Sequence, residues 1–180
     1  MQQADEKQLI ARILDGHAEE YGYFMTQYGE EVFQLVVRLV PVQQDAEELV
    51  QDAFVRAYDK LDTYTGEASF QTWLCRIAYN LTISWLRKQK MKYTSIDERL
   101  DVSDADIDQL LDDDSRIQQL KDACTQLKPD EQTLVNLFYY DDMPVRDIAY
   151  ILGMEQGSVA VRLYRIRKKL YLIIKRMEML

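Results

Sequence analysis

The stretch "DDMPVRDIAYILG" (141–153), followed directly by "MEQGSVAVRLYRIRKKL" (154–170), decides the fold of the C-terminal part of the chain. Pro144 stands near the start of the first segment and Gly153 ends it, a pattern typical of a short helix. A second helix begins only a few residues later. Two helices joined by a tight turn that contains glycine form a helix-turn-helix, whose second helix enters the major groove of DNA.

The second of these predicted helices carries two separate faces. At ~100° per residue, one arc of the helix is apolar. It holds Val159, Leu163, Ile166 and Leu170. A second arc, which we name the basic ridge, holds Ser158, Arg162, Arg165 and Lys169. The pattern predicts a helix that packs on one side and offers a cationic ridge to an anion on the other, with a merely solvated basic face as the alternative.

The acidic residues of the chain are concentrated away from this helix. The formal net charge is -9, yet residues 94–115 alone carry one basic and nine acidic side chains. Such a composition is typical of a solvated, flexible linker. We therefore expect two small helical domains, residues 1–93 and 116–180, joined by an acidic linker at 94–115, within which Ile107, Leu110 and Leu111 could form a brief helix or a contact on a partner.

The N-terminal domain is predicted to be a bundle of four helices, at residues 5–14, 22–40, 45–61 and 70–90. The third of these has one apolar face, made of Ala46, Leu49, Val50, Ala53, Phe54 and Ala57. Its opposite face carries Glu47, Glu48, Gln51, Asp52 and Arg56. The apolar face predicts a core, and the polar face is either plain solvent surface or a docking surface for another protein.

The fourth predicted helix combines a buried side with an unusual polar stripe. Its apolar arc consists of Phe70, Leu74, Ile77, Ala78, Leu81 and Trp85. A second, exposed stripe is predicted for Trp73, Arg76, Asn80 and Arg87. An aromatic face stacks on unpaired bases, an amide reads base edges and cations hold phosphates, so the stripe suits single-stranded nucleic acid. The alternative is a half-buried Trp73 beside ordinary surface arginines.

Other functions find little support in the sequence. His17 is the only histidine, no glycine-rich phosphate loop occurs, and no cluster of residues has metal-ligand spacing, so we expect neither an enzyme nor a bound metal or cofactor. No span is apolar enough to cross a membrane, and the N-terminus lacks a secretory signal, which together predict a cytoplasmic protein without direct membrane insertion. Cys75 and Cys124 are expected to be reduced thiols.

Three segments in a fixed order carry a resemblance to a known family. They are "DAEELVQDAFVRAYDKL" (45–61), "YTGEASFQTWLCRIAYNLTISWLRKQK" (64–90) and "LKPDEQTLVNLFYYDDMPVRDIAYILGMEQGSVAVRLYRIRKKL" (127–170). With the acidic segment between them, they resemble bacterial extracytoplasmic-function sigma factors, which contain only a region-two and a region-four domain. The resemblance covers nearly the whole chain. It implies an all-α protein that directs RNA polymerase core to promoters and assists promoter melting.

The resemblance also implies partners and site residues. Region two would dock on the β′ clamp helices of polymerase through Glu48, Gln51 and Asp52, and region four would meet the β flap. The residues implied for the −10 element are Tyr64, Thr65, Gly66, Ser69, Trp73, Arg76 and Asn80. The residues implied for the −35 element are Ser158, Arg162, Tyr164, Arg165, Lys168 and Lys169. Most members of the family are also held inactive by an anti-sigma factor, often one anchored in the inner membrane.

The chain departs from the family pattern at three positions, and one rival function fits part of the sequence. Ser84, Glu155 and Ala160 each replace a residue type that is common in the family. The rival is a stand-alone helix-turn-helix regulator that uses residues 1–115 for dimerisation or effector sensing. It explains the C-terminal half equally well, but it gives no reason for the stripe of Trp73, Arg76 and Asn80.

Overall fold

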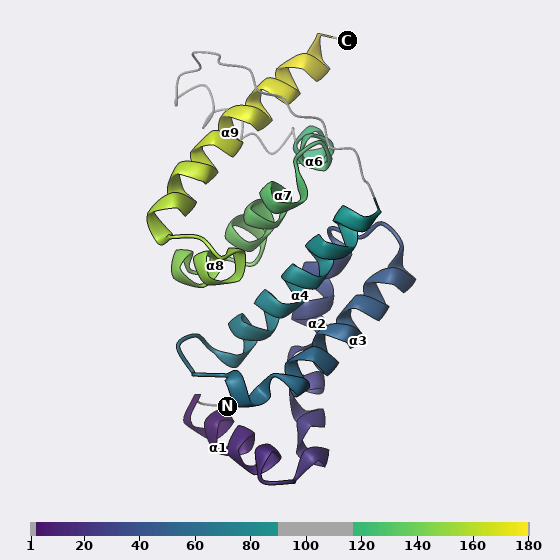
Figure 1. Ribbon diagram of the computed structural model, residues 1–180. Helices are drawn as coiled ribbons and strands as arrows, with labels where there is room; N and C mark the ends of the chain where they lie inside the picture. The colour runs from purple at the N-terminus through teal and green to yellow at the C-terminus, as the bar shows by residue number, and fades with distance from the viewer. Residues whose placement is uncertain (1–2, 90–116, 180) are drawn as a thin grey trace.

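The structure is a computed structural model that describes residues 3–89 and 117–179 (Figure 1). Within these two ranges the chain forms helices and short connections without a β-strand, which confirms the predicted all-α fold. The expected acidic linker at 94–115, with its brief helix, lies outside the described residues. Among the described helices, not one combines the length and the apolar character that crossing a bilayer requires.

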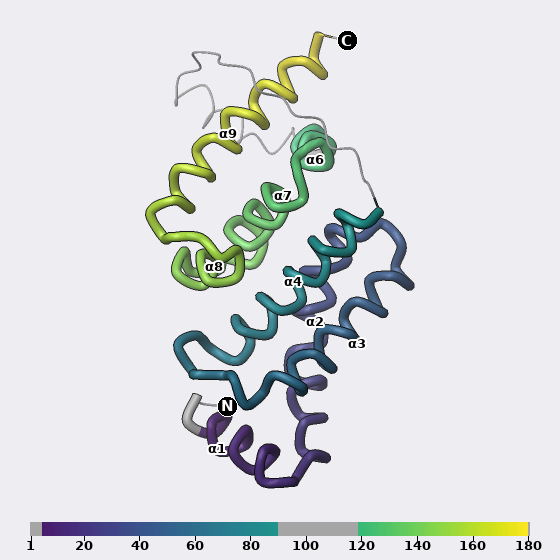
Figure 2. The backbone as a smooth tube through the Cα atoms, viewed as in Figure 1, coloured from purple at the N-terminus to yellow at the C-terminus, as the bar shows by residue number. Residues whose placement is uncertain are grey.

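The N-terminal part consists of α1 (Gln3–Leu14), α2 (Gly22–Val37), α3 (Gln43–Asp59) and α4 (Phe70–Lys88), with short 3-10 turns at Ala18–Tyr21 and Leu61–Thr63. All four predicted helices are therefore present. α2, α3 and α4 pack against one another in pairs (Figure 2). α2 ends earlier than predicted because Val40 precedes Pro41, and a proline disfavours helical geometry in the residue before it.

The faces of α3 lie as predicted. Its apolar residues are buried, with Val50 partly so, and Glu48, Gln51 and Asp52 are exposed. The faces of α4 differ from the prediction, because Ile77, Leu81 and Trp85 are only half-buried while Trp73, Cys75 and Tyr79 on other sides are buried. The reason is that α4 packs on α2 and α3 with one side and on a helix of the C-terminal part with another. A helix with two packed sides has no single buried arc.

The C-terminal part contains α6 (Ile117–Thr125), α7 (Pro129–Val135), a π-helical turn (Asn136–Tyr140), α8 (Val145–Leu152) and α9 (Gln156–Glu178). α8 and α9 are the predicted helix-turn-helix. Gly153 ends α8 with φ +65°, a left-handed conformation that favours glycine. The predicted apolar arc of α9 is buried, as expected. The sequence pattern does not predict α6 and α7, which are short.

The two parts of the chain lie against each other through α4 and α8 (Figures 1 and 2). Beside this contact, the guanidinium of Arg38, directly after α2, donates to both carboxylate oxygens of Asp141 at 2.8 and 2.9 Å. Arg38 also lies over the ring of Tyr140. In addition, buried side chains of both parts belong to one hydrophobic cluster.

Candidate nucleic-acid interfaces

The first turns of α9 present an exposed polar surface. Ser158, Tyr164 and Arg165 are exposed, and Tyr164 keeps 42% of its surface accessible. Lys168 is half-buried, and its ammonium lies 4.7 Å from the centre of the Tyr164 ring, within cation–π range. We name Ser158, Tyr164 and Arg165 the outer face of α9. A surface of hydroxyl, phenol and guanidinium groups can donate to both base edges and phosphates.

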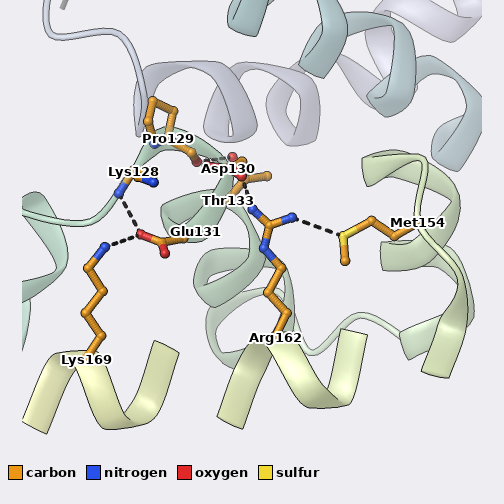
Figure 3. Close-up of polar contacts among 8 residues, drawn as sticks. All are labelled: Lys128, Pro129, Asp130, Glu131, Thr133, Met154, Arg162 and Lys169. Atoms are coloured by element: carbon orange, nitrogen blue, oxygen red, sulfur yellow. Dashed lines mark hydrogen bonds and ion pairs between the residues drawn. The ribbon is translucent and has the colours of Figure 1, made fainter. Parts of the chain in front are cut away.

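The rest of the basic ridge is turned toward α7 (Figure 3). Arg162 pairs with Asp130 and also approaches the sulfur of Met154 at 3.5 Å. Lys169 pairs with Glu131 at 2.7 Å, and only 10% of the lysine side chain is exposed. The expectation of one continuous exposed ridge is therefore wrong, because α7 packs against this side of α9 and places carboxylates beside it. A DNA contact by Arg162 or Lys169 stays a prediction.

The loop before α4 is held by its own hydrogen bonds. The hydroxyl of Tyr64 donates to the carbonyl of Ala68 at 2.8 Å, and Ser69 caps α4 by accepting the backbone N–H of Thr72 at 3.1 Å. Gly66 has φ +77°, and a Cβ there would lie 2.9 Å from the side chain of Lys7. The loop is thus shaped before any ligand binds. Thr65 at its tip is exposed.

An aromatic cluster of Tyr64, Phe70 and Trp73 joins this loop to the first turn of α4. The ring of Tyr64 lies 5.3 Å from that of Trp73 and 5.7 Å from that of Phe70. Burial, and next the nearby charge of Glu6, raise the pKa of the Tyr64 phenol, so it stays protonated and can keep donating to Ala68. The loop therefore packs on buried aromatic rings.

The predicted polar stripe of α4 is only partly exposed. Asn80 and Arg87 are exposed, but Trp73 is 8% exposed, so its expected place in an exposed stripe is wrong. It packs into the aromatic cluster instead. Arg76 is half-buried, with its guanidinium 4.8 Å from the centre of the Tyr150 ring of α8. The C-terminal part therefore covers one of the predicted −10 residues.

The sequence pattern does not predict three groups that contact candidate site residues: the carboxylates of Asp130 and Glu131, and the ring of Tyr150. A partial signal existed for the first two. On the helical wheel, Arg162 lies about 70° from the middle of the apolar arc of α9, whereas Arg165 lies about 130° from it. The nearer position predicts a side chain at the edge of a packed surface. No comparable signal links Tyr150 to Arg76, since the contact joins two distant segments.

Comparison with known proteins identifies the family. Sigma-70 region 2 matches residues 24–91, and sigma-70 region 4 matches residues 117–170. The two matches cover more than half of the chain, in the order that the sequence predicts. The chain belongs to the sigma-70 family, in its extracytoplasmic-function group, and is a sigma factor that directs transcription initiation at promoters. The rival function of a stand-alone regulator is not favoured.

Individual relatives agree with this assignment over nearly their full length. The chain is 32% identical over 175 residues to the ECF RNA polymerase sigma factor SigW of Bacillus subtilis, covering 91% of this chain and 94% of the relative. It is 27% identical to the ECF RNA polymerase sigma-E factor of Escherichia coli, covering 93% of each chain.

Solved structures support the fold. CnrH in complex with the cytosolic domain of CnrY superposes with a TM-score of 0.65 at 21% identity, covering 93% of this chain and 96% of that one. The sigma factor RpoE of Bartonella quintana, in complex with the anti-sigma factor NepR, superposes with a TM-score of 0.62 at 20% identity, covering 87% and 98%.

Proposed function

We propose that the outer face of α9 reads the −35 element and that α4, with the loop before it, reads the −10 element. The observation that carries this proposal is the placement of the outer face of α9. Its side chains project from the first turns of the second helix of a helix-turn-helix, where base edges are contacted in proteins of this architecture. Lys168 lies one turn further along α9 and is suited to a phosphate contact.

The −10 assignment is supported by the shaped loop of residues 64–69. Thr65 and Gly66 lie at its tip, and Ser69 closes it at the start of α4. A preformed loop packed on buried aromatic rings can offset the few kcal/mol that extrusion of a base from the duplex costs. Asn80 is accessible for a base edge, whereas Trp73 acts as part of the wall behind the loop rather than as an exposed stacking platform.

The contact between α8 and α4 implies a rearrangement on the promoter. Arg76 is covered by Tyr150 as long as α8 rests on α4. The −10 and −35 elements lie about two turns of DNA apart, at ~34 Å per turn, so two adjacent domains cannot reach both elements at once. We therefore expect the two parts to separate when the promoter is bound, which exposes Arg76.

Polymerase and an inhibitor complete the proposed set of partners. The exposed acidic face of α3, with Glu48, Gln51 and Asp52, is proposed to dock on the β′ clamp helices, and the C-terminal part on the β flap. Two of the similar solved structures are complexes with a second protein, and in one of them that second protein is named as an anti-sigma factor. We propose such an inhibitor for this chain as well. The chain acts in the cytoplasm and needs no catalytic step or cofactor of its own.

Run-off transcription tests the proposal. Core RNA polymerase is supplied with a library of duplexes randomised over the −35 and −10 elements, with and without the protein. We expect transcripts from a defined subset of sequences only when the protein is present. Transcripts that do not depend on it, or that show no sequence preference in both elements, would contradict the proposal.

A further inference from the structure

Two basic side chains of α9 are paired with neighbouring carboxylates at the start of α7 (Figure 3). Arg162 pairs with Asp130, with about a third of each side chain exposed, and Lys169 pairs with Glu131, with 10% and 17% exposed. Because Asp130 and Glu131 are consecutive residues, both pairs join α9 to a single turn of α7. We name these two pairs the α7–α9 clamp.

The spacing of the clamp restricts how α9 can move. Arg162 and Lys169 lie seven residues apart, which is about two helical turns or ~10 Å along the axis. The buried apolar arc of α9 restrains one side of the helix, and a single ion pair would add a restraint at only one further point. Two pairs at this separation resist both a pivot and a rotation about the helix axis.

The carboxylate side of the clamp is itself fixed. The Oε2 atom of Glu131 that binds Lys169 also accepts the backbone N–H of Lys128 at 2.9 Å. The hydroxyl of Thr133 donates to the carbonyl of Pro129 at 2.8 Å and fastens the same turn. A second guanidinium nitrogen of Arg162 reaches Met154, in the turn between α8 and α9. The clamp therefore connects α7, the turn and α9.

We propose that Arg162 and Lys169 are positioning residues, which set the rotation of α9 so that Ser158, Tyr164 and Arg165 face the −35 element. This inference rests on the proposed function of α9. Even a partial rotation of α9, well short of one residue step of ~100°, would turn Arg165 away from the groove. The guanidinium nitrogens that Asp130 and Met154 engage are also not offered to a base or a phosphate.

The inference differs in a measurable way from a direct DNA contact by Arg162. If Asp130 merely competed with DNA for Arg162, removing the carboxylate would strengthen binding to the correct promoter. If the pair positions α9, the same change makes the surface less negative but leaves the rotation of α9 less fixed. Binding to any DNA then rises, because it depends on charge, while discrimination between promoters falls.

A charge swap in the full-length protein provides the test. The probes are a promoter that the wild-type holoenzyme selects from a library randomised at −35, and a copy with a scrambled −35 element. The readout is the ratio of the two transcripts with core polymerase. We expect Arg162→Asp to lower this ratio about tenfold or more, as for the loss of one good base contact. Combining it with Asp130→Arg should restore the ratio to within about threefold of wild type, since the pair is re-formed in reverse.

Arg165→Asp combined with Asp130→Arg is the matched control, because Arg165 does not pair with Asp130 and should not be rescued. A swapped protein that folds, by circular dichroism and thermal melting, but remains as defective as Arg162→Asp would overturn the inference. If the swapped protein does not fold, the isosteric Asp130→Asn variant decides. A lower ratio supports the inference, and an unchanged or raised ratio overturns it. A wild-type holoenzyme without promoter preference would instead refute the proposed function, and this inference with it.

Discussion

The two helices proposed to read the promoter, α4 and α9, are both partly covered, but by different kinds of contact. The inner side of α9 is held by carboxylates of its own domain, in pairs that are 10–35% exposed. Within the polar stripe of α4, Arg76 is covered by Tyr150 of α8, from the other part of the chain. The ion pair of Arg38 and Asp141 is a further contact between the two parts. The first contact belongs to the fold of a domain. The second joins the two parts of the chain, and we expect it to open without either part unfolding.

The largest effect is expected inside the C-terminal part. Lys169→Ala leaves Glu131 without its cation in a site with little water, so the free energy of unfolding should fall by about 3 kcal/mol. Urea denaturation measures this. Lys175→Ala is the matched control on the same helix, because its pair with Glu178 is more exposed and should contribute less than ~1 kcal/mol. Equal effects of the two substitutions would show that the clamp is no more than a surface ion pair.

A smaller effect is expected on the outer face of α9. Arg165→Ala should weaken binding to the selected −35 duplex by ~1–3 kcal/mol while leaving stability unchanged, because its side chain is exposed. Fluorescence anisotropy across a salt series measures both affinity and salt slope. Arg56→Ala, an exposed arginine on α3, serves as the control and should have no effect. Equal losses on all DNA sequences would identify Arg165 as a phosphate contact only.

On α4, Asn80→Ala should reduce open-complex formation by about fivefold, the equivalent of one net hydrogen bond of ~1 kcal/mol. Permanganate footprinting on a duplex promoter measures the melting. Binding of the closed duplex should not change, because Asn80 is expected to act on the opened strand. Ser84→Ala, one turn further along and also exposed, is the control. Normal melting with Asn80→Ala would remove this residue from the −10 set.

The smallest effect on stability is expected for the contact between the two parts. The pair of Arg38 and Asp141 keeps more than a quarter of each side chain exposed, so Arg38→Ala should cost less than ~1 kcal/mol. The consequence should appear in hydrogen exchange and limited proteolysis instead. The protection of α4 and α8 should fall together, while that of α9 stays constant. A simultaneous loss in α9 would mean that the two parts unfold as one unit.

The sequence was sufficient for most elements, the short α6 and α7 excepted, and insufficient for their mutual contacts. Periodicity located the four N-terminal helices and the helix-turn-helix, since each has an apolar face and local end signals. The burial of Trp73 could not be predicted, because a helical wheel assumes one packed side and α4 has more than one. The pairing of Arg162 with Asp130 joins residues 32 positions apart, and that of Arg38 with Asp141 joins residues 103 apart. Periodicity within one helix carries no information on which distant carboxylate will face it.

Cys75 is buried and Cys124 half-buried, and this low accessibility makes an opening of the molecule directly measurable. Burial raises the pKa of Cys75 to about 12 and that of Cys124 to about 11. At neutral pH only about one Cys75 side chain in 10⁵, and about one Cys124 side chain in 10⁴, is a reactive thiolate. Cysteines introduced on the exposed faces of α3 and α9 would therefore react with maleimide dyes far faster than the native pair. A donor and an acceptor dye could be placed on the two domains without first replacing either natural cysteine, and the distance between the domains could be followed as polymerase and promoter are added.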